Sequence, residues 1–137
     1  MNTLLMISSL VLPLLLSGSD DTQVAKEIPL MTRLLPDVPG KEGLLEKVVL
    51  RPGESDPPHR HNADVFLYVL EGTIITQKKG DPPRTLHAGD VYYESPTDIH
   101  TETRNASSVQ PATLLVFFVK KIGAPSTVSL RGGGVDH

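Results

Sequence analysis

The sequence predicts an all-β protein, and three observations support this fold class. Twelve Pro and eleven Gly among 137 residues divide the chain into short segments. Short apolar segments recur between turn signals, with a length of about four to seven residues that is typical of strands. No segment after Lys41 has the periodicity of an amphipathic helix. Short strands at this spacing favour a β-sandwich or a β-barrel.

The predicted strands alternate with turns along the chain. The segment 20–41 is polar and interrupted by Pro29, Pro36 and Pro39, so at most one short edge strand is expected there, around residues 30–35. Turn residues separate the later apolar segments, as in Arg51-Pro52-Gly53 and Ala88-Gly89-Asp90. The strands expected after residue 41 are 44–50, 65–70, 73–77, 84–86, 91–93, 99–103 and 113–119.

Composition excludes several classes of function. A net charge of −3 provides no basic excess for a phosphate backbone, so nucleic acid is not an expected partner. The absence of Cys excludes a disulfide framework, a thiolate nucleophile and a Cys-ligated metal site. Any metal site must therefore use nitrogen and oxygen ligands.

The N-terminus resembles an export signal. The apolar run Leu4 to Leu16 has thirteen residues and contains Pro13, which makes it too short to span a bilayer comfortably. Ser17 and Ser19 offer small residues before a cleavage site, so we expect residues 1–19 to be a signal peptide and the protein to be periplasmic or secreted. No stable membrane span is then expected. The alternative is an uncleaved apolar helix or anchor.

Two predicted strands are apolar on both faces, which indicates that both faces are covered. Alternation in 65–70 separates Val65, Leu67 and Val69 from the other three residues, yet neither set is polar. The segment 114–119 has the same property. Because one sandwich of this size covers one face of each sheet, a homodimer is expected to cover the other. The alternative is that the N-terminal segment folds over that face.

Three histidines form the candidate metal site. His59 and His61 are two residues apart, so an extended chain projects both side chains from one face. His100 opens another strand about forty residues later, and antiparallel folding can return it to the pair. Three imidazoles would leave open positions on a divalent Fe, Mn, Ni, Cu or Zn ion.

These histidines and the glycines around them resemble the motifs of a small single-domain cupin. Gly53, His59, His61 and Gly72 match the first cupin motif. Gly89 and His100 match the second, with Pro96 and Asn105 each one place late. The resemblance implies a double-stranded β-helix, or jelly-roll barrel, over residues 42–122. Residues 20–41 would be an N-terminal extension, and residues 123–137 would be a C-terminal tail.

The sequence departs from the cupin pattern at one ligand. Val65 stands where the motif has a glutamate, and a valine side chain cannot bind a cation. Glu94 and Glu102 share strand phase with His100, whereas Asp64 has the wrong phase, and a surface position is the simpler expectation for all three. Glu94 and Tyr92 are the candidate catalytic residues. The other two histidines are not expected in the site: His87 is an exposed turn residue, and His137 is a tail residue without a visible role.

The expected function is therefore metal-centred. The resemblance implies dioxygenase, isomerase or decarboxylase chemistry on a small molecule, and the fold alone does not choose among them. The alternative is a non-catalytic module that binds a small ligand or a metal, which the missing glutamate slightly favours.

Overall fold

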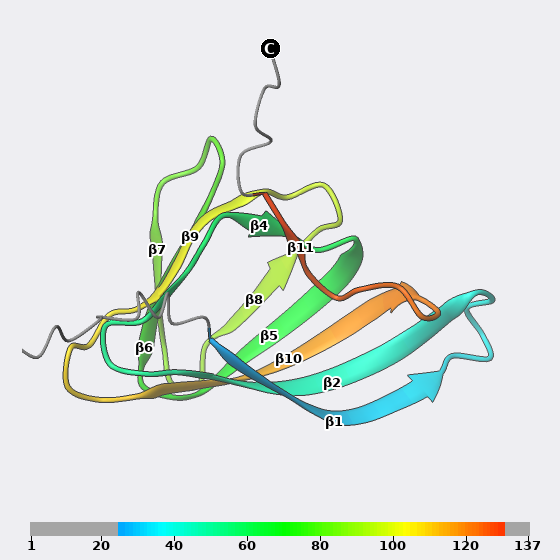
Figure 1. Cartoon of the computed structure of the whole chain (residues 1–137), viewed down its shortest axis with the longest axis horizontal. Helices are drawn as coiled ribbons and strands as arrows, with labels where there is room; N and C mark the ends of the chain where they lie inside the picture. Colours follow the sequence, from blue (N-terminus) through cyan, green and yellow to red (C-terminus); the bar gives the residue numbers. More distant parts are fainter. Residues whose placement is uncertain (1–24, 131–137) are drawn as a thin grey trace, which may run out of the picture.

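Residues 25–130 are described by a computed structural model, and they form strands connected by turns and loops, with no helix (Figure 1). This confirms the predicted all-β class. The expected signal peptide, residues 1–19, and His137 lie outside the described residues. The strands are β1 (Lys26–Leu34), β2 (Lys41–Leu50), β3 (Ser55–Asp56), β4 (His59–Arg60), β5 (Ala63–Glu71), β6 (Thr73–Lys78), β7 (Arg84–His87), β8 (Val91–Glu94), β9 (His100–Asn105), β10 (Ala112–Lys121) and β11 (Val128–Ser129).

The strands form two antiparallel sheets that pack as a jelly roll (Figure 1). One sheet has the order β1-β2-β10-β5-β8, and the other has the order β11-β4-β9-β6-β7, with β3 paired to β9. Strands that are distant in the sequence, such as β2 and β10, are therefore neighbours. This topology confirms the double-stranded β-helix that the cupin resemblance implied.

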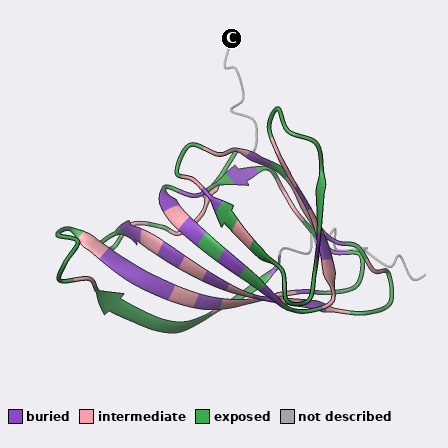
Figure 2. Ribbon diagram, turned by 180° about the vertical axis from the view of Figure 1, so that it is seen from behind, coloured by how far each residue is buried: buried purple, intermediate pink, exposed green. Residues whose placement is uncertain are grey.

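The core lies between the sheets and follows the two-residue period of the strands. In β5, Val65, Leu67 and Val69 are buried, whereas Phe66 and Tyr68 are exposed. The alternation is visible as bands of purple and green along this strand (Figure 2). The inward side chains of β10 complete the same core. Both faces of β5 are thus apolar, and only one of them is covered by the barrel.

Two flanking segments take part in the barrel beyond what their sequences indicated. β1 begins at Lys26 and pairs with β2 along its length, although Pro29 interrupts it. A register shift between Pro29 and Met31 and the edge position of β1 explain this, because an edge strand tolerates a residue without an N–H group. In the expected tail, β11 pairs with β4, and the Leu130 amide donates to the Pro58 carbonyl.

In the described part of the chain, no helix is long and apolar enough to cross a membrane.

Gly72, between β5 and β6, lies close to the backbone of Pro111 and Ala112. It has a φ of 80°, and a Cβ there would lie 2.6 Å from the Pro111 carbonyl oxygen, whereas Gly80 has a φ of 91° and open space around its Cα. We expect Gly72→Ala to lower the free energy of unfolding by about 3 kcal/mol, against about 1 kcal/mol for the matched control Gly80→Ala. Urea denaturation measures both losses. Equal losses would show that the contact with Pro111 is not rigid.

Candidate metal centre

The three predicted histidines meet inside the barrel. His59 on β4 pairs directly with His100 on β9, and His61 follows two residues after His59. The ring centroids are 5.0 Å apart for His59 and His61, 5.2 Å for His59 and His100, and 5.5 Å for His61 and His100. All three side chains are buried. Pairing between β4 and β9 therefore supplies the convergence that the spacing alone left open.

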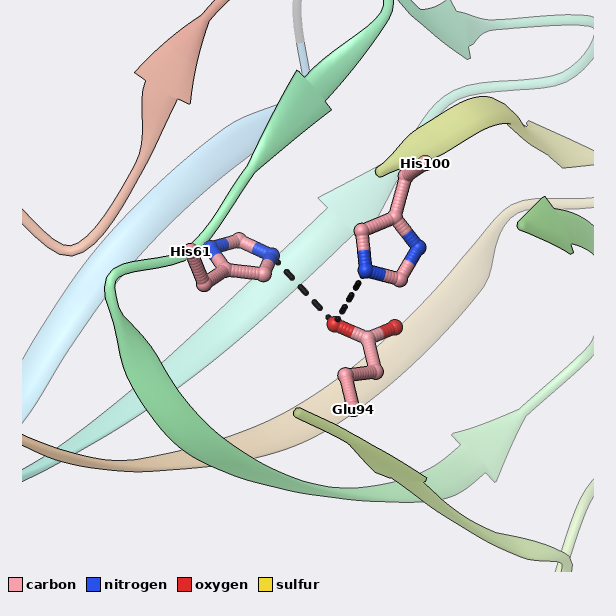
Figure 3. A group of neighbouring side chains, drawn as sticks. All are labelled: His61, Glu94 and His100. Atoms are coloured by element: carbon pink, nitrogen blue, oxygen red, sulfur yellow. Dashed lines mark ion pairs between the residues drawn. The ribbon is translucent and has the colours of Figure 1, made fainter. Parts of the chain in front are cut away.

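Glu94 completes the cluster from the other sheet. It ends β8 and is buried, and its Oε2 lies 3.3 Å from the Nε2 atoms of both His61 and His100 (Figure 3). One donor atom from each of His61, Glu94 and His100 lies within 4.8 Å of the others. This closest group of donor atoms contains Glu94 in place of His59, whose ring stands beside it.

Glu94 occupies the space that the missing glutamate would have used. In the register of β5 and β8, Glu94 lies directly opposite Val65, and both residues are buried. Directly opposite residues of an antiparallel pair share one face of the sheet. A carboxylate therefore reaches the cavity from the neighbouring strand, one cross-strand position away from Val65.

Backbone carbonyls fix the orientation of two rings. The Nδ1–H of His59 donates to the Pro57 carbonyl, and the Nδ1–H of His61 donates to the Ser126 carbonyl, both at 2.9 Å. With the Nδ1 proton used in this way, a neutral imidazole presents its Nε2 lone pair, which is the arrangement of most metal-binding histidines. The loop before β11 thus orients His61 toward the centre.

Within residues 25–130, His100 has no hydrogen-bond partner on either ring nitrogen, although it is only 1% exposed. Its Nε2 is close to Glu94 in distance, without the angles of a hydrogen bond. Buried polar atoms without partners are rare because they lose their hydration without compensation. Two imidazole nitrogens and a carboxylate oxygen that converge in this way are stabilised by a cation or by a shared proton. The donor set therefore fits a metal ion.

The two rings beside Glu94 respond oppositely to their surroundings. Burial lowers the pKa of His61, but the hydrogen bond and the negative charge of Glu94 outweigh this effect and raise that pKa overall. Burial lowers the pKa of His100, and the Glu94 charge does not compensate for it. Without a metal, the surroundings therefore favour the protonated form of His61 and the neutral form of His100.

The cluster opens into a cavity of about 300 Å³. This volume is at the lower end of the range for small-molecule sites, about 300 to 1,000 Å³. One wall is apolar and includes Leu67, Leu114 and Phe118. The polar lining residues are Glu27, Asp56, His59, His61, Glu94, Thr103, Thr127 and Ser129.

The remaining sequence candidates lie elsewhere. The Tyr92 ring is 5.4 Å from Lys78 Nζ, near Arg84, and it does not line the cavity within the described residues. Asp64 accepts a hydrogen bond from Tyr93 at the surface, and His87 is exposed. Glu102 forms an ion pair with Arg104. The side-chain amide of Asn105 donates hydrogen bonds to the carbonyls of Leu50, Arg51 and Gln110.

Sequence reasoning missed two parts of the site. Glu27 comes from β1, within the N-terminal extension that the resemblance implied, and Thr127 and Ser129 come from the implied C-terminal tail. The alternation in β1 contained no signal for Glu27, since most of its residues are exposed. Glu27 is itself exposed, and it reaches the cavity because pairing with β2 places it opposite Val48, which also lines the cavity.

Comparisons with solved structures show the same fold. A DMSP lyase from Ruegeria pomeroyi aligns with a TM-score of 0.65 and 23% identity over 82% of this chain and 55% of its own. An uncharacterised protein with a double-stranded β-helix domain from Klebsiella pneumoniae aligns with a TM-score of 0.60 and 16% identity. The alignment covers 77% of this chain and 84% of that protein. An oxalate oxidase in complex with glycolate aligns with a TM-score of 0.61 and 20% identity, over 84% of this chain and 61% of its own. This chain thus spans little more than half of the DMSP lyase's length.

The sequence itself provides the family assignment. No curated protein matches this sequence. The family model of the cupin domain matches residues 46–118, which is more than half of the chain and includes all three histidines and Glu94. This protein therefore belongs to the cupin family.

Proposed function

We propose that this cupin binds a divalent transition metal ion through His59, His61, His100 and Glu94 and acts as a metal-dependent enzyme on a small molecule. The observation that carries the proposal is the convergence of His61 Nε2, His100 Nε2 and Glu94 Oε2 from three buried residues, with no hydrogen-bond partner for His100 in the described part of the chain. Imidazole and carboxylate donors suit Fe, Mn, Ni, Cu or Zn better than Ca or Mg.

The surrounding residues support a reaction with an organic molecule. A bound divalent ion would supply Lewis-acid or redox chemistry. The apolar wall of Leu67, Leu114 and Phe118 limits water around a substrate, and the carbonyls of Pro57 and Ser126 keep the His59 and His61 rings in one orientation. Glu94 is placed either to bind the ion or to accept a proton within 3.3 Å of two imidazoles.

The enzymatic reading is favoured over a non-catalytic module by the position of Glu94. The sequence argument for a non-catalytic module is that Val65 replaces the glutamate of the motif. Glu94 weakens this argument, because it brings a carboxylate from the neighbouring strand β8, directly opposite Val65. Two proteins of similar structure, a DMSP lyase and an oxalate oxidase, have different activities. The proposed reaction belongs to the dioxygenase, isomerase or decarboxylase class.

Metal content tests the proposed centre. We expect the purified protein to bind about one equivalent of a divalent transition metal, and His61→Ala to reduce the bound metal at least about tenfold, because one donor and its hydrogen bond to Ser126 are lost together. His87→Ala is the matched control, since His87 is exposed beside Asp90. Elemental analysis by mass spectrometry after equal metal loading measures all three proteins. Equal metal content in His61→Ala and His87→Ala would contradict the proposal.

We also propose that a second copy of this chain covers the outer face of the five-stranded sheet. The exposed apolar side chains on this face are Phe66, Tyr68, Leu70, Val91 and Tyr93. The alternative cover, the N-terminal segment, is not favoured by its described part, because β1 extends the sheet at the edge beside β2 and does not lie across β5. A two-fold symmetric contact would bury the same apolar residues of both copies.

Replacing Phe66 by Glu tests this interface. Two copies of a negative charge would meet near the two-fold axis, so we expect Phe66→Glu to convert a dimer into a folded monomer. Val109→Glu is the control, since Val109 is 75% exposed in the loop before β10. Light scattering coupled to size-exclusion chromatography measures the mass. A monomeric parent protein would refute the proposed dimer.

We propose, on the sequence of residues 1–19 alone, that the protein is exported. N-terminal sequencing of the protein from its native host should then begin shortly after Ser19. A mature protein that retains Met1 or Asn2 would contradict export by cleavage.

A further inference from the structure

The segment that follows β10 crosses from one sheet to the other beside the histidines. β10 belongs to the five-stranded sheet, whereas β11 pairs with β4 in the six-stranded sheet (Figure 1). Residues 122–130, which we term the strap, make this crossing. Thr127 and Ser129 of the strap line the cavity, and the Leu130 amide donates to the Pro58 carbonyl. The strap therefore forms one side of the cavity next to the metal-binding cluster.

The orientation of the His61 ring depends on this strap, whereas that of the His59 ring is set locally. His59 donates from Nδ1 to the carbonyl of Pro57, two residues before it in the sequence. His61 donates from Nδ1 to the carbonyl of Ser126, 65 residues after it, and the Thr127 hydroxyl oxygen lies 3.3 Å from the same nitrogen. The direction in which His61 Nε2 points is thus fixed by a long-range contact with the strap.

A buried ion pair holds the start of the strap. Lys120 on β10 and Glu42 on β2 lie directly opposite each other, and both are buried. Each of them also binds the backbone of the strap: Lys120 Nζ donates to the Ala124 carbonyl at 2.7 Å, and Glu42 Oε1 accepts from the Gly123 amide at 3.1 Å. The dehydration of a buried ion pair is costly and is compensated when further hydrogen bonds use its remaining donors and acceptors. The strap supplies such bonds to both partners.

Pro125 alone separates the anchored carbonyl of Ala124 from the carbonyl that orients His61. The ring of a proline fixes its φ at about −65° and restricts the backbone of the residue before it. Ala124 is held by Lys120, and Pro125 has little freedom to rotate. The position of the Ser126 carbonyl therefore follows from the position of the ion pair.

We propose that Lys120 and Glu42 are positioning residues of the metal centre and that they act on His61 through the strap. By holding the backbone of residues 123 and 124, they place the Ser126 carbonyl where it aims His61 Nε2 at the metal ion. A loose strap lets the His61 ring turn, so Nε2 is aimed at the ion for a smaller fraction of the time. This inference rests on the proposed function for its last step only, because the hydrogen bond from His61 to Ser126 is present without a metal.

Replacing Pro125 by Gly tests the connection without touching the ion pair. Pro125 is exposed, so Pro125→Gly frees the backbone before Ser126 without removing a buried side chain. Pro82→Gly is the matched control, since Pro82 is exposed in the turn between β6 and β7. Heteronuclear NMR of the metal-free protein measures how fast the Nδ1 protons of the histidine rings exchange with water. Competition with a chelating dye measures the affinity for zinc.

We expect the His61 Nδ1 proton of Pro125→Gly to exchange at least about threefold faster relative to that of His59, because its hydrogen bond to Ser126 opens more often. The zinc affinity should fall about tenfold, as is typical when the hydrogen-bond partner of a metal-binding histidine is lost. Pro82→Gly should keep both values of the parent protein. Gly72→Ala, which destabilises the barrel outside the strap, should keep the ratio of the two exchange rates.

A double variant tests the ion pair itself. Glu42→Gln/Lys120→Met removes both charges together, so no buried charge is left without a partner. The Gln side chain keeps an acceptor for the Gly123 amide, whereas the Ala124 carbonyl loses its donor. We expect this variant to change the His61 exchange rate and the zinc affinity in the same direction as Pro125→Gly. If it does not fold, Pro125→Gly decides alone.

The outcomes separate this inference from the proposed function. Faster exchange at His61 together with weaker zinc binding supports the positioning role. An exchange ratio at the parent value in Pro125→Gly, an equal change in Pro82→Gly or Gly72→Ala, or faster exchange with an unchanged zinc affinity overturns it. Absence of zinc binding in the parent protein overturns the metal centre, and the exchange rates then still decide whether the anchored strap orients His61.

Discussion

The contact between Glu94 and the imidazoles of His61 and His100 is the interaction on which the site depends. The carboxylate comes from the five-stranded sheet, whereas His100 comes from the six-stranded sheet and His61 from the loop after β4. The contact therefore exists only when the two sheets are packed face to face. A metal ion at this point would be bound by both layers and would stabilise the folded state over the unfolded chain.

The rest of the barrel positions these groups and shapes the space beside them. The pairing of β4 with β9 sets His59 opposite His100, and the pairing of β5 with β8 sets Val65 opposite Glu94. The loop before β11 uses the Ser126 carbonyl to orient His61, and Asn105 holds three carbonyls where β2 and β10 approach β9. The cavity is then lined by apolar side chains together with the carboxyl groups and two of the imidazoles.

Predictions from the sequence were strongest where local pattern and residue chemistry agreed. The two-residue alternation in β5 and the turn residues predicted strands, and the His59-x-His61 spacing predicted two donors on one face. Glu94 was a candidate only by its phase, with a surface position as the simpler expectation. The strand phase also failed to exclude Glu102, because the register shift near the start of β9 turns it toward Arg104.

The sequence by itself determined the all-β class and the chemical type of the donors, because these follow from periodicity, turn residues and the absence of Cys. It also determined the cupin family, through the His and Gly motifs and the match to the cupin-domain model. Only the tertiary structure decided that Glu94 faces the histidines, that Glu27 and Asp56 share their cavity, and that residues 126–129 close against His61. The physical reason is that these neighbours are set by strand register and by the packing of two sheets, and both are long-range properties that no short stretch of sequence encodes.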